Sequence, residues 1–172
     1  MKTLLLLRHA KAQPGANRDP DRERSLTDRG HRNSQLVGIA VGERWLPDLI
    51  LCSPSVRTVE TMHGIIATLP KAPEVILDES LYGGGVSDYV SAIAKNGGRA
   101  ETLLVIGHNP AIHETAVGLV RTPDARMSAK FPTSALAVIA FTTEEWTGIR
   151  AGAGDLVRFL RPKDLGAPDA GD

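Results

Sequence analysis

Two apolar runs, each ended abruptly by a histidine, constrain the fold of this chain more than any other feature. Residues 4–7 are four leucines followed by Arg8-His9, and residues 103–106 read Leu-Leu-Val-Ile before Gly107-His108. Short apolar runs that stop at a polar turn are typical of strands buried on both faces of a parallel sheet. Ligands bind at the carboxyl edge of such sheets. Two strands that each bring a histidine to this edge, one beside an arginine, predict a cationic site for an anion.

The bulk composition limits the classes of protein that this chain can be. It has 172 residues, 42% of them hydrophobic and 23% charged, and a formal net charge of +0. One globular domain is expected, with no general attraction to nucleic acid or to an anionic membrane. The single cysteine, Cys52, excludes an internal disulfide and disfavours a cysteine-based zinc site. Since no segment resembles a signal peptide or a membrane span, we expect a cytoplasmic protein.

The order of elements predicts a three-layer α/β/α fold with a mostly parallel central sheet and helices on both faces. The last two strands should extend this sheet, at least partly antiparallel. We expect one domain over residues 1–161 and a flexible tail over 162–172. Residues 10–25 and 121–133 are predicted loops. The predicted strands cover residues 3–8, 48–52, 74–77, 102–107, 135–141 and 155–160, and the predicted helices begin at Thr27-Asp28, at Ser53-Pro54, near residue 86 and at Pro110.

The Arg8-His9 pair has two interpretations. A strand can simply end in polar residues, and that reading is as good as the functional one for this pair alone. In the functional reading, Arg8 binds an oxyanion and the His9 imidazole is a nucleophile. Neighbouring cations would help to keep that imidazole neutral.

Two further junctions between a strand and a helix repeat the pattern. Ser53-Pro54 would cap a helix whose N-terminus favours phosphate, and Arg57 lies about one turn inside it. Taken alone, this is a capped surface helix with a solvated arginine, and a single histidine such as His108 is more often structural. Three such junctions together are much less expected by chance. A phosphoryl group suits this set, because arginines and an imidazolium at His108 would balance its oxygens while His9 attacks.

These residues carry a resemblance to a known family. Arg8-His9-Ala10, Ser53-Pro54-x-x-Arg57-x-x-x-Thr61 and Gly107-His108-Asn109-Pro110 resemble the signature of the histidine phosphatase superfamily, which has the phosphoglycerate mutase-like fold. The compact length, the Arg24-to-Gly30 segment and Phe131-Pro132-Thr133-Ser134-Ala135 resemble its SixA-type phosphohistidine phosphatase branch. The likeness runs from residue 3 to about residue 160.

The resemblance implies a role for each matching residue. His9 would be the nucleophile that becomes phosphorylated, and Arg8, Arg57 and His108 would complete the phosphate site. Arg24 matches a loop arginine of SixA-type members and is carried over as a weaker phosphate ligand. Asn109 is expected to line the site. Ala10 stands where the family usually has glycine, and its small methyl group should be tolerated.

The proton donor is the role with the weakest sequence signal. Asp78, Glu79 and Asp88 are the local candidates, and each is more often a surface carboxylate than a catalytic acid. We assign the role to Glu79 because it directly follows the third predicted strand. A strong acid is less necessary for a phosphohistidine, since a phosphoramidate leaving group protonates readily near neutral pH.

The sequence therefore predicts a metal-independent phosphatase that works through a phosphohistidine intermediate at His9, without a cofactor. No carboxylate-histidine metal set surrounds His108 or His113, and Gly83-Gly84-Gly85 lacks the lysine of a phosphate-binding P-loop. The expected substrate is a phosphohistidine on a protein partner. The alternatives are a small phosphomonoester as substrate, or a protein of the same design that binds phosphorylated ligands without turnover.

Overall fold

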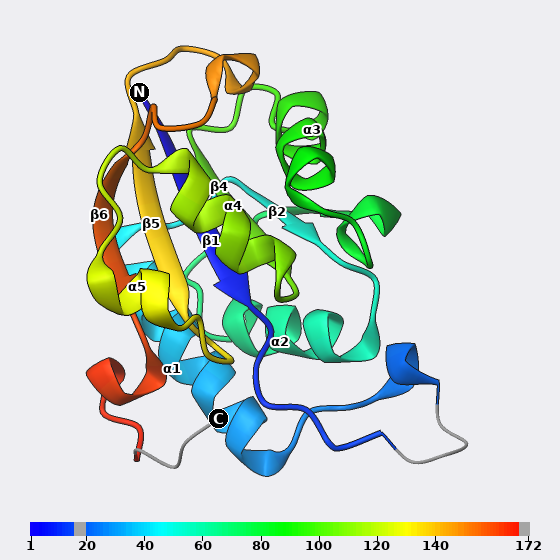
Figure 1. Ribbon diagram of the computed structural model, residues 1–172. Coiled ribbons are helices and arrows are strands. Elements are labelled where there is room, and N and C mark those ends of the chain that lie inside the picture. Colours follow the sequence, from blue (N-terminus) through cyan, green and yellow to red (C-terminus); the bar gives the residue numbers. More distant parts are fainter. Residues whose placement is uncertain (16–19, 169–172) are drawn as a thin grey trace.

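The computed structural model describes residues 1–15 and 20–168, which form a central sheet with helices on both faces (Figure 1). The sheet has six strands in the order β3-β2-β4-β1-β5-β6. The first four are parallel to one another, whereas β5 is antiparallel to β1 and β6 is antiparallel to β5. This confirms the predicted α/β fold class, including the antiparallel pair at the end.

The strands alternate with α-helices along the chain, apart from the two consecutive helices between β4 and β5 and the final hairpin. The strands are β1 (Lys2–Arg8), β2 (Leu49–Cys52), β3 (Glu74–Leu77), β4 (Thr102–Gly107), β5 (Leu136–Phe141) and β6 (Asp155–Leu160). The helices are α1 (Asp28–Arg44), α2 (Val56–Ile66), α3 (Val86–Asn96), α4 (Ala111–Leu119) and α5 (Ala125–Ala129). The short 3-10 helices are η1 (Asp21–Glu23), η2 (Glu79–Leu81), η3 (Trp146–Gly148) and η4 (Pro162–Leu165).

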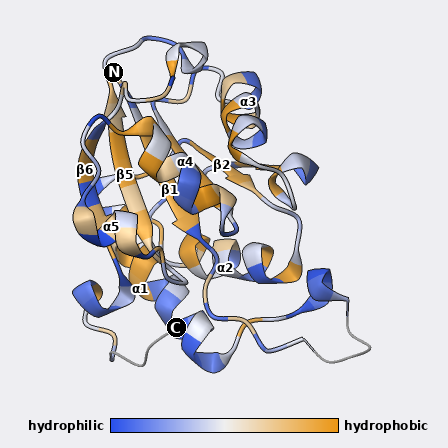
Figure 2. Cartoon of the chain, in the orientation of Figure 1, coloured by the Kyte–Doolittle hydropathy of each residue, from blue (hydrophilic) through white to orange (hydrophobic). Residues whose placement is uncertain are grey.

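The leucines of β1 divide the core into two layers. Leu4 and Leu6 pack with α3, α4 and α5 on one face of the sheet, while Leu5 and Leu7 pack with α1 and α2 on the other. Successive strand residues point to opposite faces, so a strand covered on both sides needs an unbroken apolar run. Figure 2 shows the hydrophobic strands enclosed by helices with hydrophilic outer faces.

The neighbouring strands β1 and β4 form a topological switch point. The chain leaves β1 toward α1 on one face and leaves β4 toward α4 on the opposite face. Such divergence opens a crevice at the carboxyl ends of the two strands. Arg8 and Gly107 are register partners in this pair, and the His9 amide donates to the Gly107 carbonyl at 3.1 Å. The two histidine turns therefore lie at the same place on the sheet edge.

Two local predictions are wrong. Helix α2 begins at Val56, and its cap is Ser55, which accepts a hydrogen bond from the Thr58 amide. Ser53 is not the cap, because its hydroxyl is bonded to His108. The predicted loop 121–133 contains α5, whose cap Asp124 accepts from the amides of Arg126 and Met127. A helix of one turn has no periodicity long enough to be recognised in sequence.

The first residues of the C-terminal segment form a short helix. Helix η4 follows β6 directly, and the Arg161 side chain and amide both donate to Asp164. Leu165 packs against the core layer that contains α1 and α2. Residues 169–172, the end of the predicted tail, lie outside the described residues. Among the described residues, no helix has the length and apolar character needed to span a bilayer.

Candidate active site

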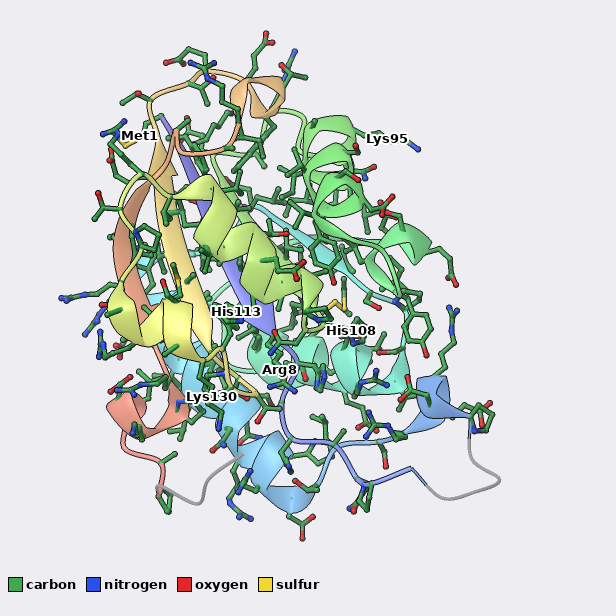
Figure 3. The ribbon with its side chains drawn as sticks, in the orientation of Figure 1. Met1, Arg8, Lys95, His108, His113 and Lys130 are labelled. Atoms are coloured by element: carbon green, nitrogen blue, oxygen red, sulfur yellow. The ribbon has the colours of Figure 1, made fainter. Side chains whose placement is uncertain are left out.

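His9 and His108 meet at the carboxyl edge of the sheet. Their ring centroids are 5.4 Å apart. Figure 3 shows Arg8 and His108 close to one another at this edge, whereas Met1 and Lys95 lie at the opposite end of the molecule. The sequence prediction that two distant apolar runs would bring their histidines together is confirmed by this geometry.

The His9 ring is fixed as a neutral imidazole with one open nitrogen. His9 is 7% exposed, and its Nδ1 lies 2.7 Å from the Ala10 carbonyl oxygen. A carbonyl only accepts, so Nδ1 carries the hydrogen and Nε2 keeps its lone pair. Burial lowers the pKa of His9 to about 3, and the nearby charges of Arg57 and Arg8 add to the effect. This neutral ring is the state that a nucleophile requires.

The turn that carries His9 is itself anchored to α2. The Ala10 amide donates to Thr61 Oγ1 at 2.9 Å, and Thr61 Oγ1 donates to the Arg57 carbonyl at 2.7 Å. Ala10 is fully buried, so the residue that stands in place of glycine fits without exposing its methyl group. The sequence motif that joins Arg57 to Thr61 thus connects helix α2 to the backbone beside His9, the predicted nucleophile.

Arg57 projects its guanidinium from the first turn of α2 and is 5% exposed. Its Nη1 donates to the Asp21 carbonyl at 2.8 Å and its Nη2 to Asp21 Oδ2 at 3.1 Å. Its buried Nε has no hydrogen-bond partner among the described residues. A buried donor left open is costly unless a ligand occupies it, so this edge of the guanidinium suits a phosphoryl oxygen.

Arg8 is held from the opposite side by the segment before β5. Its Nη1 donates to the Phe131 carbonyl at 3.2 Å, and the Asn109 side-chain amide donates to the same oxygen at 2.9 Å. Asn109 thereby fixes the Phe131 carbonyl that orients Arg8. The expectation that Asn109 also touches the ligand stays a prediction.

His108 has the hydrogen-bond geometry of a neutral imidazole in this ligand-free structure, and the imidazolium expected beside a bound phosphoryl group stays a prediction. Its Nδ1 lies 3.3 Å from Arg57 Nη2, and since a guanidinium only donates, Nδ1 must be unprotonated. Its Nε2 lies 2.7 Å from Ser53 Oγ and so donates to that hydroxyl. Burial, reinforced by the Arg57 charge, lowers the pKa of His108 to about 4. The charged form of His108 is disfavoured because the ring is buried and lies beside Arg57, and a bound anion would counter both effects.

Two positioning residues were not identified in the sequence. Tyr89 on α3 accepts a hydrogen bond from the His108 amide at 3.0 Å and donates to the Leu81 carbonyl at 2.9 Å. Ser53, interpreted only as a helix cap, orients the His108 ring instead. The sequence does not distinguish a serine that caps a helix from one that bonds a histidine ring. Tyr89 lies on an amphipathic helix, where a buried aromatic residue is expected in any case.

Asp21, which was not identified in the sequence, accepts hydrogen bonds from Tyr82, Arg57 and Arg24. Its Oδ2 accepts from Tyr82 at 2.7 Å as well as from Arg57, and its Oδ1 accepts from Arg24 Nε at 3.1 Å. The hydrogen bond from Tyr82 is the main cause that lowers the pKa of Asp21 to about 2, and the Arg57 charge contributes. The 3-10 helix η1 is therefore docked on the arginine of the candidate site. No motif in a loop rich in charged residues predicted this contact.

Arg24, predicted as a weaker phosphate ligand, serves the same loop in the ligand-free geometry. Its Nε binds Asp21 and its Nη1 donates to the Gln13 carbonyl at 3.1 Å. Arg24 thus reaches the site through Asp21, and direct contact with a phosphoryl group stays a prediction.

The three acidic candidates, Asp78, Glu79 and Asp88, are each engaged in local hydrogen bonds. Glu79 is exposed and forms a two-pronged ion pair with Arg22, which lowers the pKa of Glu79. Asp78 accepts from the amide and hydroxyl of Ser80, and Asp88 accepts from the Gly85 amide at the start of α3. The ion pair with Arg22 favours the ionised form of Glu79, which has no proton to donate. The proton-donor role of Glu79 stays a prediction.

No group of three or more histidine, cysteine or carboxylate side chains is arranged to hold a metal ion within residues 1–15 and 20–168. Cys52 is a buried free thiol, and burial raises its pKa to about 12. His113 Nε2 donates to the Met127 carbonyl at 2.7 Å, and the His113 ring stacks on Phe131. The innermost part of the site is formed by two arginines and two histidines, Arg8, Arg57, His9 and His108, and these side chains suit an anion.

Known proteins share both the sequence and the fold of this chain. Residues 4–83 match the family model of the histidine phosphatase superfamily (branch 1). An uncharacterized protein of Mycobacterium tuberculosis is 34% identical over 172 residues, covering 91% of this chain and 100% of that protein. The matched segment 4–83 contains Arg8, His9 and Arg57.

Two solved structures are similar over nearly the whole chain. The SixA protein from Nakamurella multipartitia is 27% identical with a TM-score of 0.81, covering 94% of this chain and 96% of that one. The protein histidine phosphatase SixA complexed with tungstate is 25% identical with a TM-score of 0.74, covering 95% of this chain and 99% of that one. The shared fold extends through β4 and β5, beyond the residues that match the family model.

Proposed function

Because the chain belongs to the histidine phosphatase superfamily and is a phosphatase, we propose that it dephosphorylates phosphohistidine on a protein substrate. The observation that carries this proposal is the state of the His9 ring: its Nδ1 hydrogen is donated to the Ala10 carbonyl, and its Nε2 has no hydrogen-bond partner among the residues that the structure describes. The likeness to SixA structures supports the choice of substrate. A small phosphomonoester is the alternative that the experiment must separate.

In the first step, the His9 Nε2 lone pair attacks phosphorus and the bond between phosphorus and the substrate nitrogen breaks. The electron pair of that bond stays on the departing ring. Arg8, the open Nε edge of Arg57 and His108 bind the phosphoryl oxygens as charge develops on them. The result is His9 phosphorylated at Nε2, with Nδ1 still donating to the Ala10 carbonyl.

In the second step, water attacks the phosphorylated His9. A bond between the water oxygen and phosphorus forms, the phosphorus–Nε2 bond breaks, and its electron pair returns to Nε2. The water loses a proton to solvent, and hydrogen phosphate leaves. Because Nδ1 keeps its hydrogen throughout, the His9 ring departs from phosphorus as a neutral imidazole rather than as an anion.

The state of the nearby carboxylates supports a nitrogen-linked substrate. Asp21 and Glu79 both have pKa values lowered by hydrogen bonds from Tyr82 and Arg22, respectively. An alkoxide leaving group needs a proton donor, whereas a phosphohistidine ring protonated at its second nitrogen does not. A site with ionised carboxylates at its exposed side favours the second kind of substrate.

The test is substitution of His9 by alanine, measured against both substrate classes. We expect His9→Ala to abolish release of phosphate from a histidine-phosphorylated protein and to retain part of the affinity for inorganic phosphate. Wild-type protein should also acquire an acid-labile phosphoryl group that His9→Ala lacks. A wild type that releases phosphate only from small phosphomonoesters would select the alternative. A wild type with no turnover of any phosphorylated compound would leave only a binding protein.

A further inference from the structure

Asp21 presents an ionised carboxylate on the exposed side of the site. The residue is 57% exposed, and its side chain is fixed by Tyr82, Arg57 and Arg24. Two of these donors share Oδ2, while Oδ1 accepts only from Arg24 among the described residues. Since each carboxylate oxygen has two acceptor positions, Oδ1 can take a further donor from a bound molecule.

The site has a clear inner and outer side. His9 is nearly buried, its ring lies 5.4 Å from that of His108, and the His108 ring lies 5.4 Å from the edge-on ring of Tyr82. Tyr82 in turn donates to Asp21. In an in-line displacement, the leaving group departs from the face of phosphorus opposite the nucleophile. A leaving group attacked by the buried His9 therefore departs toward the outer side, where Asp21 lies.

The His9 ring illustrates the hydrogen bond that the departing imidazole ring of the substrate requires. Its Nδ1–H donates to the Ala10 carbonyl, so the ring can bond to phosphorus and leave it again as a neutral imidazole. A phosphorylated histidine of the substrate is also bonded to phosphorus through one ring nitrogen, on the face of phosphorus opposite His9. It leaves as neutral imidazole only if its second nitrogen carries a hydrogen, and that hydrogen needs an acceptor. Asp21 is an acceptor on that side with room for a further donor: both oxygens of Glu79 bind Arg22, whereas Asp21 Oδ1 accepts only from Arg24 among the described residues.

We propose that Asp21 makes the enzyme selective for nitrogen-linked over oxygen-linked phosphoryl groups, by accepting the N–H of the departing imidazole ring. The inference rests on the proposed function, whose substrate class it narrows. The carboxylate holds the phosphorylated ring in its protonated form. When the phosphorus–nitrogen bond breaks, the electron pair goes to the ring nitrogen that held phosphorus, and the second nitrogen keeps its hydrogen, so the product is neutral imidazole. No proton is transferred in the step.

An ester substrate gains nothing from this carboxylate. An oxygen leaving group has no N–H to donate, and a negative Asp21 opposes the negative charge that develops on the departing oxygen. The same side chain therefore favours one substrate class and disfavours the other, which makes the ratio of the two activities the decisive quantity.

The experiment compares phosphoimidazole with p-nitrophenyl phosphate, whose leaving group departs without a proton donor. For Asp21→Asn, we expect kcat/KM for phosphoimidazole to fall about 10- to 100-fold, the effect of losing one charge-assisted hydrogen bond. The ratio of kcat/KM for phosphoimidazole to kcat/KM for p-nitrophenyl phosphate should fall by at least the same factor, because the ester loses an opposing negative charge. Inhibition by inorganic phosphate, measured on the same variant, reports whether the phosphate site is intact. Glu23→Gln removes a carboxylate from the same turn and should alter neither activity.

Equal losses on both substrates, together with weaker inhibition by phosphate, would mean that Asp21 only supports Arg57, and the inference would be overturned. Unchanged activity on phosphoimidazole would overturn it as well. A wild type that hydrolyses p-nitrophenyl phosphate but not phosphoimidazole refutes the selectivity while leaving a phosphatase in place. A wild type that hydrolyses neither of these compounds nor a histidine-phosphorylated protein refutes the proposed function itself.

Discussion

At the residue scale, the two histidines of the site differ in which ring nitrogen is open. His9 directs Nδ1–H to a carbonyl and leaves Nε2 free, whereas His108 directs Nε2–H to Ser53 and leaves Nδ1 facing Arg57. Identical side chains at equivalent strand ends thus have different roles, because different neighbours fix their tautomers. His9 suits attack on phosphorus, and His108 suits accepting a proton when an anion arrives.

The state of His108 predicts that anion binding takes up a proton. Its pKa is about 4 without a ligand, and a bound dianion raises that pKa because opposite charges stabilise each other. Affinity should therefore increase as pH falls from 7, by at most about tenfold per unit, and level off near pH 4. Sulfate is the ligand to use in calorimetry, since it stays a dianion across this range.

The control for this measurement is His108→Gln, which keeps a hydrogen-bonding side chain but cannot be protonated. Sulfate affinity of this variant should be weak and should vary less with pH than that of the wild type. If the two proteins show the same pH dependence, or if the wild type shows none between pH 7 and pH 5, another group takes up the proton or none does.

At the element scale, α2 links the phosphate site to the stability of the fold. The helix begins at Val56, its cap is Ser55, and Arg57 lies in its first turn. Three neighbouring parallel strands end at this place, so the N-terminus of α2 and the two histidine turns share one sheet edge. The existence of this helix could be predicted from sequence, but its cap could not, because Ser53 and Ser55 both fit the capping pattern.

Replacing Ser55 by alanine should lower the free energy of unfolding by about 1 kcal/mol, the usual cost of losing a capping hydroxyl. The variant should also bind sulfate less tightly, since the first turn of α2 carries Arg57. Urea denaturation and calorimetry measure the two effects. Ser91→Ala, on the exposed surface of α3, is the matched control and should change stability by less than about 0.5 kcal/mol. Equal effects of the two substitutions would contradict the assignment of the cap.

At the scale of the whole molecule, the catalytic steps proposed above use only side chains of the chain itself. Cations from β1 and α2 and the histidine after β4 converge at one edge, although the formal net charge of the chain is +0. A local concentration of positive charge is sufficient to bind a phosphoryl group, because the interaction acts at contact distance.

Extensive treatment with EDTA should leave phosphatase activity unchanged, because His9 supplies the nucleophile and the arginines supply the positive charge. The measurement is kcat/KM for p-nitrophenyl phosphate before and after chelation, with the metal content determined in parallel. Loss of activity that returns on addition of one divalent metal ion would refute the metal-independent mechanism.

The sequence by itself determined the fold class and the parallel strands. It also indicated the four residues that the fold brings together at the sheet edge, Arg8, His9, Arg57 and His108. These follow from local signals, since unbroken apolar runs define buried strands and strand ends define the place of a site. The tertiary structure decided the protonation of both histidines and the contact of Asp21 with Arg57. The tautomer of His108 and the contact of Asp21 with Arg57 depend on partners that lie 36 or more residues apart in the chain, and the neutral state of both histidines depends on burial. No fixed spacing in the sequence encodes either property. The positions of the two histidines and their different roles were therefore predicted from the sequence, whereas their tautomers and the contact of Asp21 were decided by the tertiary structure.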